Sequence, residues 1–189
     1  MNFRKLHRKI APILFLPLLL SALTGMSYRI GRSWFGLSNE FGNLMMTIHE
    51  GRYLGKPLVP IYVLLTGLGL IGIVITGISM LKPRKKIDKN NLKPAKFNAR
   101  LLHSLIAPVF FLPLFVSAST GIIYRLGKEW FGLSAQQAQF FMSIHQGSYL
   151  GSSLRAIYIL LIGLGLLIML VTGIQMTGIF RSSTSKSKS

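Results

Sequence analysis

Long runs of apolar residues dominate the pattern along the chain. Four such runs, each about 19 to 24 residues long and almost free of charge, cover residues 10–28, 58–81, 105–123 and 157–180. Because an α-helix rises about 1.5 Å per residue, each run can cross a hydrocarbon core of about 30 Å. Their Leu-, Ile- and Gly-rich composition suits helices, which satisfy their own backbone hydrogen bonds in lipid. The pattern therefore predicts an all-α integral membrane protein with four transmembrane helices.

The second half of the chain repeats the first at a fixed offset of 96 residues. Without gaps, residues 4–80 and 100–176 are identical at 42 of 77 positions. Each copy contains two spans, so both copies enter the membrane in the same orientation, and we expect a pseudo-twofold axis along the membrane normal to relate them in one four-helix bundle. The predicted organisation is a first membrane repeat (1–81), a basic cytoplasmic linker (82–98), a second membrane repeat (99–180) and a disordered tail (181–189).

A short helical pattern lies between the two spans of each repeat. Ser38 and Ser134 are good N-caps, and apolar residues at helical spacing follow each of them. In the first repeat this stripe consists of Phe41, Leu44, Met45 and Ile48. We therefore expect a short amphipathic helix on the outer side of the membrane in each repeat.

The positive charge of the chain is unevenly distributed. Of 22 Lys and Arg residues, 15 lie before the first span, between the second and third spans, or after the fourth, whereas seven lie in the other two loops. This asymmetry predicts that both termini and the linker are cytoplasmic, in a bacterial inner or plasma membrane or a thylakoid-like membrane. We interpret the formal net charge of +18 as setting topology and contacting anionic lipids, rather than as binding nucleic acid.

Several kinds of chemistry have no signal in the sequence. The chain has no cysteine, which excludes disulfides, thiolate metal sites and haem attached through C-x-x-C-H. No G-x-G-x-x-G follows a predicted strand, so no flavin or nicotinamide domain is expected. The four acids lie outside the spans, which argues against a carboxylate-based proton pump. They are Glu40, Glu50, Asp88 and Glu129.

All four histidines occupy positions that the repeat duplicates. His7 corresponds to His103 and should face it at the cytoplasmic side, and His49 corresponds to His145 and should face it at the outer side. Two imidazoles facing each other between helices are the axial ligands of a b-type haem iron, so we predict two haem b groups. A bare divalent ion is a weaker candidate because it needs three or more ligands. Histidines at a membrane boundary are often plain interfacial polar residues, and this alternative stays open.

Two further motifs have both a structural and a functional interpretation. Arg29 and Arg125 end the first and third spans, where an arginine either snorkels to the headgroups or binds a haem propionate. A Thr-Gly dipeptide occurs in every span, and we favour close helix packing for it over room for a flat macrocycle. The four threonines are Thr24, Thr76, Thr120 and Thr172.

The motifs of the repeat also carry a family resemblance. H-x-x-I-A-P-x-x-F-L-P, S-A-x-T-G-x-x-Y-R and I-H-x-G-x-Y-L-G resemble the PepSY-associated transmembrane helix family. The resemblance implies inner-membrane reductases of ferric siderophores with two b haems. Carried over by position, it makes His7, His49, His103 and His145 the axial ligands. Family members often carry a PepSY domain outside the membrane, whereas the outer segments here have about 30 residues each, so we expect a minimal form without that domain.

The principal hypothesis is transmembrane electron transfer through two bis-histidine haems, serving a ferric, siderophore or other membrane reductase. Electrons would come from a quinol or a reductase partner and pass to an acceptor that the sequence does not identify. A non-catalytic membrane scaffold or regulatory subunit without haem is the main alternative, and a small transporter or metal-handling subunit is a third. Whether the chain is itself an enzyme stays open.

Overall fold

A computed structural model describes residues 2–81 and 98–177 of the chain. The predicted tail, and the predicted linker apart from Asn98, lie outside these residues. Within them every regular element is helical, which confirms the all-α prediction. The helices are α1 (Phe3–Ser33), α2 (Asn39–His49), α3 (Val59–Ile78), α4 (Ala99–Trp130), α5 (Ala135–Gln146) and α6 (Gly151–Thr177), with short 3-10 turns η1 (Arg52–Leu54), η2 (Lys56–Leu58) and η3 (Ser148–Leu150).

Four helices are long and apolar enough to cross a membrane, as predicted. They are α1, α4, α3 with its preceding turn (Lys56–Ile78), and α6 with its preceding turn (Ser148–Thr177). With 31 and 32 residues, α1 and α4 are about 46 and 48 Å long, so their polar ends extend beyond the apolar runs. Asn2 and Asn98 cap these two helices by accepting hydrogen bonds from the backbone N–H groups of Lys5 and Leu101.

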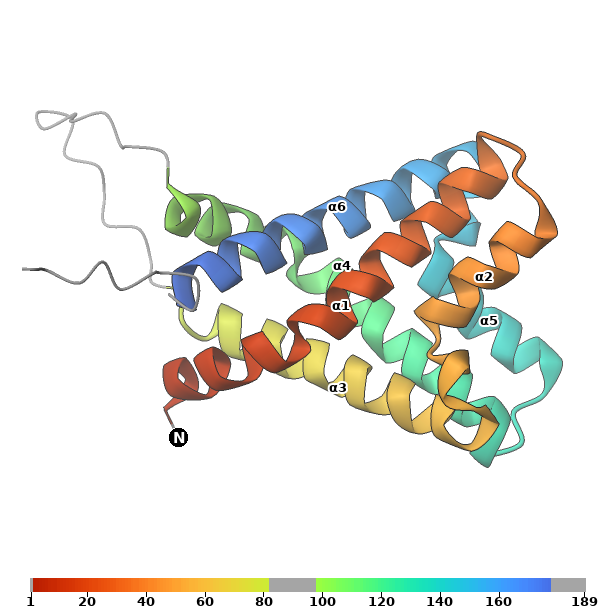
Figure 1. The fold of residues 1–189 in the computed structure, drawn as a ribbon, viewed down its shortest axis with the longest axis horizontal. Helices are drawn as coiled ribbons and strands as arrows, with labels where there is room; N and C mark the ends of the chain where they lie inside the picture. Colours follow the sequence, from red (N-terminus) through yellow and green to blue (C-terminus); the bar gives the residue numbers. More distant parts are fainter. Residues whose placement is uncertain (1, 82–97, 178–189) are drawn as a thin grey trace, which may run out of the picture.

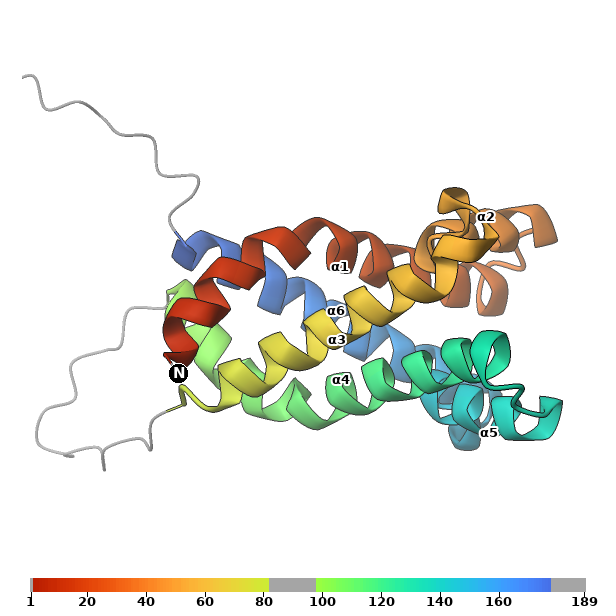
Figure 2. The same ribbon diagram turned by 90° about the horizontal axis from the view of Figure 1, so that it is seen from below.

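The four long helices form one elongated bundle (Figures 1 and 2). α1 packs against α3 and α6, and α4 packs against the same two helices, so α1 and α4 lie diagonally across the bundle. The most extensive contacts join α3 to α4 and α1 to α6, which belong to different halves of the chain. The two halves therefore share one core. The pseudo-twofold axis itself stays a prediction.

α2 and α5 lie at one end of the bundle, named here the capped end, and the N-terminus lies at the other, the terminal end (Figure 1). The Ser38 and Ser134 side chains accept from the backbone N–H groups of Phe41 and Gln137, which confirms the two predicted N-caps. α2 and α5 thus begin at fixed points and place their last residues over the bundle.

Glycines turn the chain from the short helices back towards the membrane. Gly51 and Gly147 have φ of +71° and +67°, in the left-handed region that favours glycine. A Cβ atom at either position would lie 2.5 Å from the ring of Tyr62 or Tyr158. The glycine of each I-H-x-G-x-Y-L-G block is therefore required by backbone conformation and by close packing, and it fixes the position of the histidine two residues before it.

Candidate cofactor site

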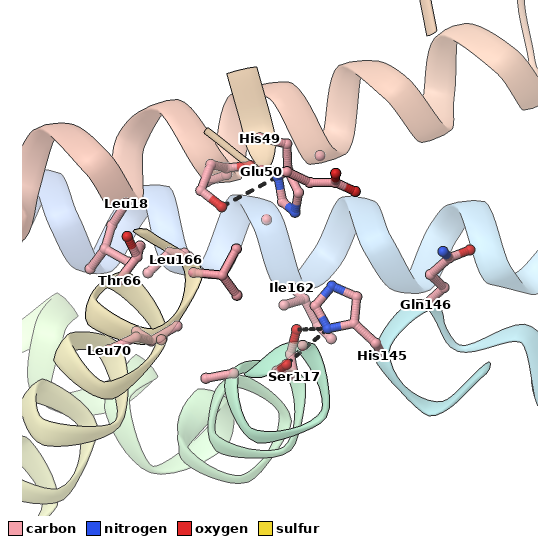
Figure 3. A pocket seen from close by; sticks show the side chains of 18 of the residues that line it. Leu18, His49, Glu50, Thr66, Leu70, Ser117, His145, Gln146, Ile162 and Leu166 are labelled. Atoms are coloured by element: carbon pink, nitrogen blue, oxygen red, sulfur yellow. Dashed lines mark hydrogen bonds between the residues drawn. The ribbon is translucent and has the colours of Figure 1, made fainter. Parts of the chain in front are cut away.

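The four histidines line two cavities, two histidines in each. His49 and His145 line a cavity of about 210 Å³ at the capped end, shown in Figure 3. His7 and His103 line a second cavity of about 60 Å³ at the terminal end. In each pair one histidine comes from each repeat, so both cavities lie between the two halves of the chain.

The capped-end histidines are held by backbone carbonyls of the long helices. His49 Nδ1 donates to the Ser21 carbonyl oxygen at 2.9 Å, and His145 Nδ1 donates to the Ser117 carbonyl oxygen at 2.8 Å. Because a carbonyl can only accept, the proton of each neutral ring lies on Nδ1, and Nε2 keeps its lone pair. Burial lowers the pKa of His49, and burial together with the neighbouring His49 charge lowers the pKa of His145 to about 4. Both rings are therefore neutral near pH 7.

The terminal-end histidines reach the same tautomer through threonine. His7 Nδ1 lies 2.9 Å from Thr76 Oγ1, and His103 Nδ1 lies 2.9 Å from Thr172 Oγ1. Each hydroxyl donates its single proton to a carbonyl of its own helix, at 2.7 and 2.6 Å. It must then accept from the histidine, so Nδ1 carries the proton here too. All four rings leave Nε2 free as a metal ligand, oriented by a hydrogen bond from the other ring nitrogen.

The Thr-Gly dipeptides have a more specific role than the predicted helix packing. Each glycine lies beside one histidine ring and leaves space for it. A Cβ atom built on the glycine would lie 3.0 Å from Cε1 of His49 at Gly25 and 3.1 Å from Cε1 of His145 at Gly121. At the terminal end the corresponding distances are 3.6 Å from His7 at Gly77 and 3.5 Å from His103 at Gly173. The position of Gly25 beside the histidine could be read from the sequence, because Ser21 and Gly25 are four residues apart and therefore lie on one face of α1.

One layer of leucines separates the two cavities. The same four leucines line both cavities and form the centre of the apolar core with Ala22 and Ala118. They are Leu18, Leu70, Leu114 and Leu166. Along α1, the 14 residues from His7 to Ser21 correspond to about 21 Å, so the two histidine pairs lie in opposite halves of the bundle.

Both predicted arginines line the capped-end cavity and reach the other repeat. Arg29 Nη2 donates to Gln146 Oε1 at 2.7 Å, and Arg125 Nη2 forms an ion pair with Glu50. Glu50 and Gln146 occupy corresponding positions in the repeat. Two interactions thus join the halves at the mouth of the cavity: an ion pair between Arg125 and Glu50, and a hydrogen bond from the Arg29 guanidinium to the uncharged Gln146 amide.

The side chains present suit a cofactor that takes two axial ligands. Within residues 2–81 and 98–177, no group of three or more His, Cys, Asp or Glu side chains is placed to hold a metal ion. Instead, two histidines line each cavity, as neutral imidazoles with free Nε2 atoms, between apolar helix faces. Bis-imidazole ligation of haem iron requires this donor set. Of the two cavities, the capped-end one offers more space.

A comparison with protein families bears on the whole arrangement. The model of the PepSY-associated TM region matches residues 30–140, more than half of the 189-residue chain. The chain belongs to the PepSY-associated TM family. The match runs from the end of α1 into α5 and includes His49 and His103. Comparisons with curated proteins and with solved structures gave no match. Membership of the PepSY-associated TM family and the four apolar helices establish an integral membrane protein.

Proposed function

We propose that this PepSY-associated TM protein transfers electrons across a membrane through two b-type haems. His7 and His103 would hold one haem at the terminal end, and His49 and His145 the other at the capped end. The observation that carries the proposal is the shared state of the four rings: each lines a cavity with its partner from the other repeat, and each has Nδ1 bound and Nε2 free.

Bound haem would supply one-electron iron chemistry, and the residues of the chain position and insulate it. Hydrogen bonds from Nδ1 orient the imidazoles and raise their basicity as ligands. The leucine layer between the cavities is apolar, so it opposes the passage of water and ions while leaving about 21 Å between the sites along α1. This arrangement favours electron transfer over ion transport.

The two cavities differ in how readily they would accept a macrocycle. The terminal-end cavity is the smaller, and its walls include the rings of Phe15, Phe110 and Phe111. We propose that these rings turn aside when haem binds there. At the capped end, Arg29 and Arg125 both line the cavity; Arg125 is already paired with Glu50, so Arg29 is the proposed partner of a haem propionate.

The direction of transfer follows from the charge asymmetry of the sequence. With 15 of 22 Lys and Arg residues on the side of the termini and the linker, we propose that the terminal end faces the cytoplasm. A quinol or a reductase would then supply electrons to the terminal-end haem. The capped-end haem would pass them to an acceptor on the other side, such as a ferric siderophore or another membrane reductase.

Haem content of ligand variants tests the proposal. The wild-type protein, purified from cells with ample haem, should show two haems per chain by the pyridine haemochrome method. His7→Ala and His49→Ala should each retain about one, because the pairs share no ligand, and the double variant should retain none. Lys9→Ala, an exposed change near His7, serves as the control. Wild-type haem content in both histidine variants would contradict the proposal.

A further inference from the structure

The two arginines at the mouth of the capped-end cavity have different electrostatic surroundings. Around Arg125 the charges balance. Glu50 Oε2 lies 3.0 Å from Arg52 Nε and is also paired with Arg125, whose Nη1 lies 3.3 Å from Glu129 Oε1. Two arginines therefore meet two carboxylates, and no positive charge is left over for a ligand.

The corresponding positions around Arg29 lack both acids. Gln146 stands in the place of Glu50, and Ser33 in the place of Glu129. Gln146 accepts a hydrogen bond from Arg29 at 2.7 Å but cannot neutralise it. Within the described part of the chain, no carboxylate forms an ion pair with Arg29. One side of the mouth is thus neutral, and the other carries an uncompensated cation.

A second arginine adds to this excess. In the second repeat, Arg155 of α6 occupies the position that corresponds to Val59 of the first repeat, where the valine side chain is only 5% exposed. Arg155 lies in the first turns of α6, which packs against α1, the helix that carries Arg29; further along this contact, Gly163 of α6 lies against Met26 of α1. Arg155 Nε is buried and has no hydrogen-bond partner among the described residues. Burying an unpaired donor costs free energy, which an anion bound between the guanidinium groups of Arg155 and Arg29 would offset.

We infer that Arg29 and Arg155 form a carboxylate-binding site at the mouth of the capped-end cavity, and that its ligand is a propionate of the haem placed there by the proposed function, on which this inference rests. Planar guanidinium groups suit a carboxylate because they donate parallel hydrogen bonds. Tyr28 and Arg29 line the cavity itself, so the ligand belongs to the cavity rather than to the surrounding lipid. Arg125, already neutralised by Glu50, contributes little.

Binding of haem and of haem dimethyl ester, whose carboxylates are blocked, tests this site. Haem-free protein with His7→Ala, in which only the capped-end site remains, is titrated with each pigment. The measured quantity is the ratio of the affinity for haem to the affinity for the ester. In this protein the ratio should be at least about ten-fold higher than in a variant that lacks the arginine contact. Arg155→Val, which restores the residue of the first repeat, should lower the haem-to-ester affinity ratio by about ten-fold. Arg125→Gln should leave the ratio nearly unchanged.

A second variant keeps both arginines and protects the test against a folding defect. Gln146→Glu places the acid of the first repeat beside Arg29, where it should compete with the propionate and also lower the ratio. If Arg155→Val and Gln146→Glu both retain the wild-type ratio, or if Arg125→Gln lowers it equally, the arginine site is wrong even when haem binds. If haem does not bind at all, or binds equally well after His49→Ala, the proposed function itself has failed.

Discussion

Replacing the glycine beside a histidine by alanine, as in Gly25→Ala, tests whether the ring of His49 needs the space that the glycine leaves. At Gly25 the new Cβ would lie 3.0 Å from Cε1 and 3.2 Å from Nδ1 of His49. Carbon atoms in favourable contact are about 3.5 to 4.0 Å apart, so the ring must move by a few tenths of an ångström. It cannot do so freely, because Nδ1 is held by the Ser21 carbonyl at 2.9 Å.

Gly77 provides a matched control in another span. A Cβ atom there would lie 3.6 Å from His7, an ordinary contact, so Gly77→Ala adds no strain. Both changes gain helix propensity, by up to about 1 kcal/mol. Overpacking costs about 1–3 kcal/mol, so we expect Gly25→Ala to be less stable than Gly77→Ala by about 2 kcal/mol. Unfolding of the haem-free protein in detergent measures this difference, and equal stability of the two variants would refute the reasoning.

Three further predictions follow from the histidine environments and the charge pattern. Thr76→Val removes the hydroxyl that accepts from His7 Nδ1 and should weaken haem binding at the terminal end by about 10- to 100-fold, measured by haem titration. Thr24→Val is the control, because the Thr24 hydroxyl bonds only to its own helix, and it should not weaken binding there. Burial lowers the pKa of His145 from 6.5 to about 4, so the unfolded state binds more protons than the folded state between these pH values. The contribution of His145 to the stability of the haem-free protein should therefore be complete above pH 6.5 and fall by about 3 kcal/mol towards pH 4. In pH-dependent unfolding, His145→Asn should flatten this profile. Cysteine labelling from outside the cell should modify Ser38→Cys but not Lys5→Cys; the reverse pattern would invert the proposed orientation.

The membrane fold was predictable because its signals are local. Hydropathy located the four spans, and the Ser38 and Ser134 caps marked where α2 and α5 begin. The helix ends were less well predicted. α1 extends from Phe3 to Ser33, beyond its apolar run, because polar residues at the membrane surface can continue a helix that the hydrocarbon core does not require.

The candidate site was predictable only where the repeat duplicated it. The repeat brought out His7 with His103 and His49 with His145, but it gave no acceptor for Nδ1. Those acceptors differ in kind between the two ends, a hydroxyl at one and a backbone carbonyl at the other, and a backbone carbonyl has no sequence signal. The sequence places Arg155 among the seven charges of the two other loops; the packing of α6 against α1, which carries Arg29 126 residues earlier, exists only in the folded bundle.

Electron transfer across a sealed bilayer tests the central claim most directly. The protein is reconstituted into liposomes that enclose a reductant, and reduction of a membrane-impermeant acceptor outside is followed by absorbance. The wild-type protein should reduce the acceptor well above protein-free liposomes. His7→Ala and His49→Ala should each abolish this, although each keeps about one haem, because transfer needs both sites. Transfer at the protein-free rate by haem-loaded wild type, or at the wild-type rate by either variant, would contradict the account.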